Sequence, residues 1–140
     1  MTDPYDEALI LPDDFIIRRI DPNQHLVPNG EGGFRISSKV FSASSDGSRG
    51  MSVDVKALIE SDNVRPEDFV TSPKYLGSVE FRARTVRNAD LWVGYEPIDG
   101  NPYHGEVWNG VDGRRFSKGQ KTALLSGCSW LVPIPKTDLG

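Results

Sequence analysis

The sequence predicts an α+β fold in which a mainly antiparallel sheet carries a C-terminal helix packed on one face. Two observations support this prediction. Apolar and charged residues alternate along residues 76–86, as expected for a strand with one buried face. Ser117 and Gln120 form a capping-box pattern ahead of apolar residues at helical spacing, which predicts a helix over 117–132.

The chain is expected to form one domain, because its 140 residues are enough to build a single core. Residues 1–14 form an acidic N-terminal arm that either docks through its short apolar run or stays loose. Residues 15–135 are the predicted α+β domain, and residues 136–140 are a short tail.

Short apolar or alternating runs between turn residues predict the other strands. These runs lie at residues 15–20, 34–41 and 91–95 and near residue 103. The three-residue gap at 88–90 predicts that the strands at 76–86 and 91–95 form an antiparallel hairpin.

Residues 23–33 and 42–50 are rich in turn-forming residues and are expected to be loops. A short helix at the sheet edge is predicted over 51–60, where Ser52 or Asp54 would cap the first turn. Another helical turn is expected to begin at Pro66, in the first helical position.

The composition of the chain argues against several classes of function. Sixteen basic and twenty acidic side chains give a net charge of -4, which disfavours broad, non-specific binding to DNA or RNA. The single cysteine, Cys128, excludes an intramolecular disulfide framework and is expected on the apolar face of the last helix. No run approaches the roughly 18 apolar residues that a membrane helix needs, and the chain begins with acidic residues, unlike a signal peptide. We therefore expect a cytoplasmic protein that does not bind membranes.

The segment 101–108 concentrates the chemistry of the chain, because it places His104 two positions from Glu106. In an extended segment these two side chains point to one face and Tyr103 points to the other. A histidine beside a carboxylate predicts a catalytic acid or base with an orienting partner. The structural alternative is that His104 bonds to a backbone carbonyl and Glu106 is solvated.

Arginine on a strand face is typical of phosphate binding, and Arg82 and Arg84 share the polar face of the strand predicted over 76–86. Ser37 and Ser38 are expected to add hydrogen bonds to a ligand, and Tyr103 is expected to be exposed. Other arginines lie in segments that could fold near this face: Arg18, Arg19, Arg35 and Arg49.

The sequence predicts neither a metal site nor a cofactor. A metal at His104 and Glu106 would need further ligands, and the sequence offers His25 and scattered carboxylates without a recognised ligand spacing. The glycine-rich segments 30–33 and 47–50 lack the lysine and spacing of a phosphate-binding loop, and no serine lies in a Gly-x-Ser-x-Gly elbow.

Three phrases resemble a group of small, uncharacterised bacterial proteins. They are ISSKVF at 36–41, GMSVD at 50–54 and NPYHGEV at 101–107, and the resemblance covers most of residues 15–110. The resemblance implies a bacterial, cytoplasmic protein and carries over no activity, cofactor or residue role.

Three functions follow as hypotheses. The first is protein–protein binding, as an accessory component of a larger assembly, because the chain lacks a catalytic signature and has an acidic arm and an aromatic-rich second half. The second is an enzyme of phosphoester or nucleotide chemistry that uses His104 and Glu106. The third is a nucleic-acid binder that uses an arginine face. Whether the loops at 23–33 and 42–50 close over His104 decides whether a pocket exists.

Overall fold

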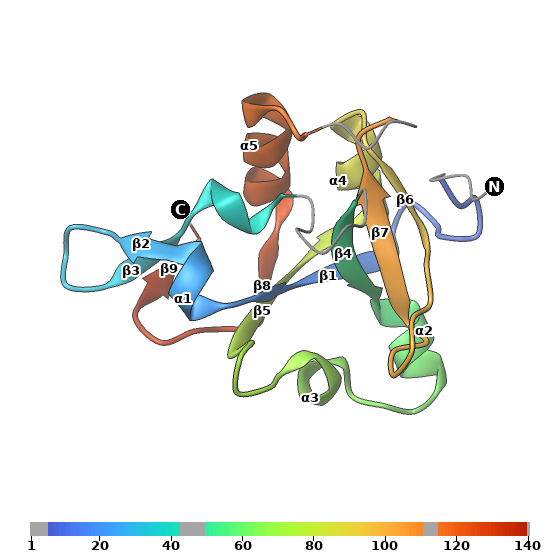
Figure 1. Cartoon of the computed structure of the whole chain (residues 1–140), viewed down its shortest axis with the longest axis horizontal. Helices are drawn as coiled ribbons and strands as arrows, with labels where there is room; N and C mark the ends of the chain where they lie inside the picture. The colour runs from blue at the N-terminus through green and yellow to red at the C-terminus, as the bar shows by residue number, and fades with distance from the viewer. Residues whose placement is uncertain (1–5, 43–49, 111–114, 140) are drawn as a thin grey trace.

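The computed structural model describes residues 6–42, 50–110 and 115–139, which form a six-stranded antiparallel sheet and a three-stranded sheet (Figure 1). The large sheet has the order β6-β7-β4-β1-β5-β8. Its strands are β1 (Phe15–Ile20), β4 (Met51–Val55), β5 (Gly77–Arg82), β6 (Trp92–Tyr95), β7 (His104–Trp108) and β8 (Ser129–Val132). Helix α5 (Lys118–Gly127) packs against this sheet, so the predicted α+β fold with a C-terminal helix is confirmed.

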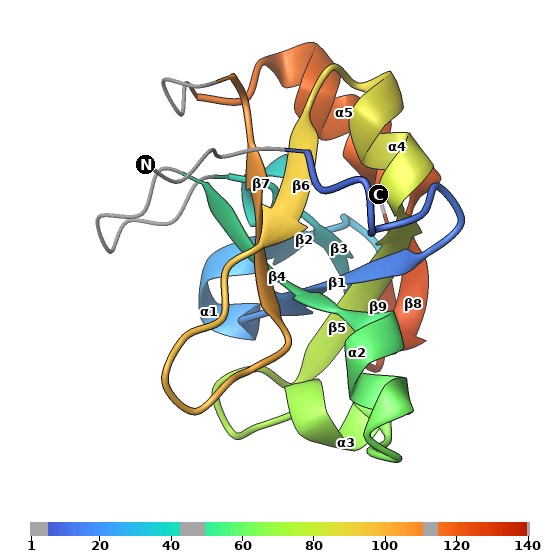
Figure 2. The same ribbon diagram turned by 90° about the vertical axis from the view of Figure 1, so that its right-hand side faces the viewer.

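Helices lie on both sides of the large sheet (Figures 1 and 2). Helices α4 (Ala83–Asn88) and α5 cover one face, which we call the core face, and α2 (Lys56–Ser61) and α3 (Pro66–Val70) lie on the other. Alternate strand residues fill the core face: Ile16, Ile20, Val53, Val55, Val79, Phe81, Val93 and Val107. A smaller apolar cluster lies under α2 and α3: Ile17, Ile59, Val70 and Tyr103.

The smaller sheet contains β2 (Leu26–Pro28), β3 (Phe34–Ile36) and β9 (Thr137–Asp138), with β3 between the other two. The loop predicted at 23–33 is therefore wrong in part, because α1 (Pro22–His25) and β2 occupy its first half. Asp21 caps α1 by accepting a hydrogen bond from the Asn23 amide at 3.0 Å. The predicted strand at 34–41 also ends early, because the 3-10 helix η1 (Ser38–Val40) follows Ile36.

The helix predicted over 51–60 is wrong in its first half. Met51, Val53 and Val55 are at most 2% exposed and point into the core, while Ser52 and Asp54 point to the opposite face. Strand β4 pairs with β1 on one side and β7 on the other, and the helix begins only after Val55. Pairing on both edges outweighs the helical spacing of the later apolar residues, so a central strand replaces the predicted edge helix.

The strand predicted over 76–86 changes into α4 after Arg82. The amides of Ala83 and Arg84 donate to the carbonyls of Asp14 and Pro12, each at 2.9 Å, so the N-terminal arm satisfies the first turn of the helix. Because α4 follows β5, the two predicted hairpin strands do not pair. Strand β5 pairs with β1 and β8, and β6 pairs with β7.

The capping box of Ser117 and Gln120 is present, but the last helix ends at Gly127 and not at residue 132. A Cβ atom at Gly127 would lie 2.5 Å from Thr85 Cγ2, so glycine permits the close approach of α5 to α4. Cys128 is extended, with φ -96° and ψ 160°, and the chain continues as β8 beside β5. The predicted apolar helical face beyond Gly127 is therefore a strand.

The arm is fastened to the domain over residues 6–14. Ile10 is fully buried, and the Glu7 amide donates to the Val93 carbonyl at 3.0 Å. Arg87 Nη2 donates to the carbonyls of Glu7 and Ile10 at 3.0 and 2.8 Å. In the part of the chain that the structure describes, no helix has the length and apolar character needed to cross a membrane.

Candidate functional site

Four polar residues of β4 and β7 share the face of the sheet that carries α2 and α3. Ser52 lies opposite Glu106, and Asp54 lies opposite His104. Because strand side chains alternate, these cross-strand partners point to one side. Asp54, His104 and Glu106 are 3%, 7% and 2% exposed. The predicted common face of His104 and Glu106 is therefore present, and two residues of β4 extend it.

The His104 ring contacts one acceptor at each nitrogen. Nδ1 lies 2.7 Å from the carbonyl oxygen of Glu96, which can only accept, so Nδ1 carries a hydrogen. Nε2 lies 3.3 Å from Glu106 Oε2, and Ser52 Oγ donates to that same oxygen at 3.2 Å. The Glu106 Oε2 atom therefore faces both the His104 ring and the Ser52 hydroxyl. The alternative that His104 bonds to a backbone carbonyl is therefore present in the structure. Its second part is wrong, because Glu106 is buried and not solvated.

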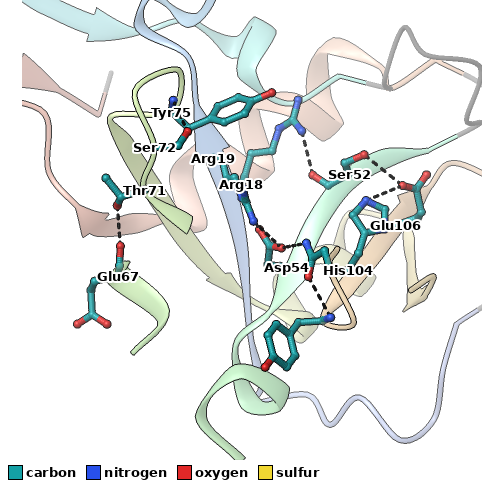
Figure 3. A network of polar contacts seen from close by, with 12 residues as sticks. Arg18, Arg19, Ser52, Asp54, Glu67, Thr71, Ser72, Tyr75, His104 and Glu106 are labelled. Atoms are coloured by element: carbon teal, nitrogen blue, oxygen red, sulfur yellow. Dashed lines mark hydrogen bonds and ion pairs between the residues drawn. The ribbon is translucent and has the colours of Figure 1, made fainter. Parts of the chain in front are cut away.

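The Asp54 carboxylate accepts hydrogen bonds from two other residues of the site, Arg19 and Asn101 (Figure 3). Its Oδ2 accepts from Arg19 Nε at 2.9 Å, and its Oδ1 accepts from Arg19 Nη2 at 3.3 Å and from Asn101 Nδ2 at 2.7 Å. The Arg19 guanidinium also lies over the rings of Phe69 and Tyr75, 5.5 and 6.0 Å from their centroids. These contacts fix Arg19 in one orientation.

Arg18 extends to the edge of β4, where the β1–β4 pairing has ended at Ile17 and Asp54. Its Nε donates to the Val40 carbonyl at 2.8 Å, and its Nη1 donates to the Ser52 carbonyl at 2.9 Å (Figure 3). Burial lowers the pKa of the Arg18 guanidinium, although arginine keeps its charge in proteins. Among the described residues, no carboxylate lies within ion-pair distance of Arg18.

A cavity of about 400 Å³ opens beside these groups. Its polar lining comes from Arg18, Arg19, Ser52, Asp54, Asp99, Asn101 and His104. Phe69, Tyr75 and Ile98 add apolar surface. The volume falls in the range of roughly 300 to 1,000 Å³ that is usual for small-molecule sites. The cavity can therefore hold a ligand that presents both polar and apolar groups.

Tyr103 is buried, so the expectation that it is exposed is wrong. It precedes the first residue of β7, and the alternation of the strand does not set its direction. Its ring packs edge to face on Phe69 with centroids 4.9 Å apart, and its hydroxyl donates to Asp62 Oδ2 at 2.8 Å. The hydrogen bond to Asp62 raises the pKa of the Tyr103 hydroxyl.

Arg82 and Arg84 do not line the cavity. They also do not share a strand face, because Arg82 ends β5 while Arg84 lies in α4. Both are exposed, and both form ion pairs with Asp13, Arg82 at 3.2 Å. This carboxylate reduces the positive charge of the predicted arginine face. Nucleic-acid binding through that face stays a prediction.

Ser37 and Ser38 also lie outside the cavity lining. Ser37 caps η1 by accepting from the Lys39 amide at 3.2 Å, and Ser38 is exposed. None of the lining residues comes from the loop predicted at 23–33. Within the loop predicted at 42–50, residues 43–49 lie outside the described part of the chain.

Five residues that line the cavity with His104 were not assigned to a site with it from the sequence: Arg18, Arg19, Ser52, Asp54 and Asn101. Arg18 and Arg19 were expected only to lie in segments that could fold near Arg82 and Arg84. A signal for two of the five was present. Ser52 and Asp54 alternate with apolar residues along 51–55, as His104 and Glu106 do with their neighbours. Two alternating segments of this kind are typical of paired strands with one polar face.

Within the described ranges, no group of three or more His, Cys, Asp or Glu side chains is placed to hold a metal ion. Comparisons of the chain with protein-family models, with curated proteins and with solved structures found no match. A bacterial origin and a cytoplasmic location therefore stay predictions, and the case for function rests on the site itself.

Proposed function

We propose that the cavity beside His104 binds a small phosphate-bearing ligand of about nucleotide size and that the protein acts on its phosphoester group. The observation that carries the proposal is Arg18. Its half-buried positive charge is held by two neutral carbonyl oxygens. Asp54 and Glu106 are near enough to interact with it electrostatically, but no described carboxylate lies within the 4.0 Å of an ion pair. A charge removed from water is stabilised by a counter-ion, and a bound phosphate would supply one.

The second arginine supports the same class of ligand. The planar guanidinium fork matches the oxygen atoms of a phosphate, and both arginines are already held in place by protein contacts. The Arg18 Nη2 and Arg19 Nη1 atoms have no hydrogen-bond partner among the described residues. Holding the donors rigid lowers the entropy cost of binding an anion.

The rest of the lining suits the other parts of a nucleotide. Phe69 and Tyr75 contribute aromatic surface to the lining beside Arg19, whose guanidinium lies over both rings. An apolar or aromatic group of the ligand would pack against this combined surface. Asp99, which also lines the cavity, is an acceptor of the kind that binds ribose hydroxyl groups. The buried pair of His104 and Glu106 supplies a proton-transfer group at the phosphate end.

The test is calorimetric titration of the protein with AMP, pyrophosphate, inorganic phosphate and adenosine. We expect the phosphate compounds to bind and adenosine to bind at least about tenfold more weakly, because charge-assisted hydrogen bonds to phosphate are the strong ones. In wild type, amide NMR shifts should change at Arg18, Arg19 and Ser52 when AMP is added.

The matched variants are Arg18→Gln and, as the control, Arg35→Gln, whose arginine is exposed on β3. We expect R18Q to weaken AMP binding by about tenfold or more and R35Q to leave it unchanged. If none of the phosphate compounds binds to wild type, or if folded R18Q binds AMP as wild type does, the proposal is wrong.

The protein-binding hypothesis is a second proposal, supported by the exposed leucines of the arm. Leu9 and Leu11 are 76% and 57% exposed, although Ile10 between them is fully buried. An apolar surface of a partner protein would cover these two side chains. The double variant L9S/L11S should keep the melting temperature of wild type and lose a stoichiometric partner recovered from the native host. Retention of that partner by the variant would count against the proposal.

A further inference from the structure

We infer that Ser52 is the nucleophile of this site and that Glu106 is its general base. The inference rests on the proposed function, whose phosphoester substrate it uses. Ser52 lines the cavity, and its Oγ donates to Oε2 of the buried Glu106 carboxylate at 3.2 Å. A serine hydroxyl becomes a useful nucleophile when an adjacent base can take its proton.

The orientation of the Ser52 hydroxyl supports this role. Because its hydrogen points to Glu106, its lone pairs are left for other directions, and Ser52 lies on the cavity wall. The backbone carbonyl of the same residue accepts from Arg18 Nη1 at 2.9 Å. A phosphate bound by Arg18 would therefore lie next to the Ser52 side chain (Figure 3).

The geometry favours Glu106 over His104 as the group that takes the proton. Both nitrogens of His104 are engaged, one by the Glu96 carbonyl and the other by Glu106. His104 therefore reaches a ligand only by breaking one of these contacts. We assign His104 as a positioning residue that holds the Glu106 carboxylate toward Ser52. This exchanges the expected roles, in which His104 was the acid or base and Glu106 its orienting partner.

No other described serine has a carboxylate as a hydrogen-bond partner. Ser37 and Ser117 cap helices, and Ser61 donates to the Leu58 carbonyl. Ser78 is fully buried and has no hydrogen-bond partner among the described residues. The combination of a cavity position and a carboxylate partner thus singles out Ser52.

The chemical step balances with the groups present and water. Ser52 Oγ attacks the phosphorus atom of the ester, the Oγ–P bond forms, and the P–O bond to the alcohol breaks. The alcohol oxygen leaves with the bonding electron pair and takes a proton from solvent, while the Ser52 proton moves to Glu106. Water then attacks phosphorus and releases Ser52, which recovers its proton from Glu106, and the proton of the water passes to solvent.

The test is covalent labelling with a biotin-linked fluorophosphonate probe, followed by intact-mass and peptide mass spectrometry. In this reaction the Oγ–P bond forms, the P–F bond breaks and fluoride leaves with the electron pair, while the proton passes to Glu106. We expect one label per chain, located on Ser52. The site of labelling in wild type requires no variant that might fail to fold.

Three variants complete the test, each checked for an unchanged thermal transition. S52A should not be labelled, and E106Q should be labelled at least about tenfold more slowly, because a carboxamide cannot accept the proton. The control S61A, which removes an exposed serine of α2, should be labelled as wild type is. Absence of a label in wild type, a label elsewhere, or an E106Q rate equal to wild type would overturn the inference.

AMP titration separates this inference from the proposed function. S52A should bind AMP within about threefold of wild type, because its arginines are unchanged. If AMP binds and Ser52 is not labelled, the nucleophile is wrong and phosphate binding stands. If Ser52 is labelled and no phosphate compound binds, the nucleophile stands and the ligand class is wrong.

Discussion

The two faces of the six-stranded sheet are built from the same strands and bury different chemistry. On the core face, alternate residues such as Val53 and Val107 are apolar and pack under α4 and α5. On the opposite face, the alternate residues Asp54, His104 and Glu106 are polar, and each is at most 7% exposed. Buried polar groups cost free energy unless they are bonded, and the contacts of these three limit that cost. The core face therefore supplies most of the stability, and the opposite face holds polar groups in fixed positions.

Truncating a large side chain on the core face should produce the largest loss of stability. Phe81 is fully buried and packs edge to face on Phe41, with ring centroids 5.8 Å apart. We expect Phe81→Ala to lower the free energy of unfolding by about 3 to 5 kcal/mol, because it leaves a cavity. Chemical denaturation measures this change. The control Phe34→Ala, at a side chain that is 45% exposed, should cost less than about 1 kcal/mol. Similar losses in the two variants would contradict the assignment of the core.

On the opposite face, neutralising the carboxylate of Asp54 should produce an intermediate loss of stability. Asp54→Asn keeps the shape of the side chain but leaves Arg19, which is 26% exposed, without its counter-ion. We expect the free energy of unfolding to fall by about 2 kcal/mol, less than for a fully buried pair. Asp13→Asn is the control, because Asp13 is 65% exposed and should change stability by less than about 0.5 kcal/mol. Equal effects of the two substitutions would show that Asp54 does not organise this face.

The comparison extends to pH through His25. His25 lies in α1, and its Nδ1 accepts from the Asp21 amide at 3.0 Å, which requires an unprotonated nitrogen. Burial, together with the charge of Arg18, lowers the pKa of His25 from 6.5 to about 4. Because the unfolded chain takes up this proton at higher pH, the stability that neutral His25 contributes is present above pH 6.5 and is lost progressively toward pH 4.

After allowance for solvent screening, this loss is on the order of 1 to 2 kcal/mol. His25→Asn keeps an acceptor near the position of Nδ1 and cannot titrate. Denaturation curves between pH 7 and pH 4 should therefore show a smaller loss for H25N than for wild type. Identical losses would show that His25 does not contribute to the acid sensitivity.

The smallest change in stability is expected at Ser52. Ser52→Ala removes one hydrogen bond to Glu106, and the His104 contact to the same carboxylate remains. We expect the free energy of unfolding to fall by about 1 kcal/mol or less in chemical denaturation. A loss as large as that of F81A would assign Ser52 to the stability of the fold and not to a site.

Parts of the fold and of the site could be predicted from local patterns. The capping box of Ser117 and Gln120, the helix starting at Pro66 and the strand at 15–20 all formed as predicted, because each depends on neighbours in the sequence. The common face of His104 and Glu106 followed from strand alternation alone. The ends of several elements could not be predicted, because a continued apolar pattern fits a strand or a helix equally well over a few residues.

The sequence by itself determined the fold class, the helix starts that carry capping signals and the position of one histidine beside one carboxylate. The tertiary structure decided which strands pair, and so brought Ser52 and Asp54 of β4 beside His104 and Glu106 of β7. It also turned Arg82 and Arg84 toward Asp13 and placed Arg18 and Arg19 in the cavity instead. Strand pairing depends on contacts between segments far apart in the chain, whereas capping and alternation depend on adjacent residues. This is why the sequence could place His104 and Glu106 on one strand face, while only the fold could bring Ser52 and Asp54 beside them.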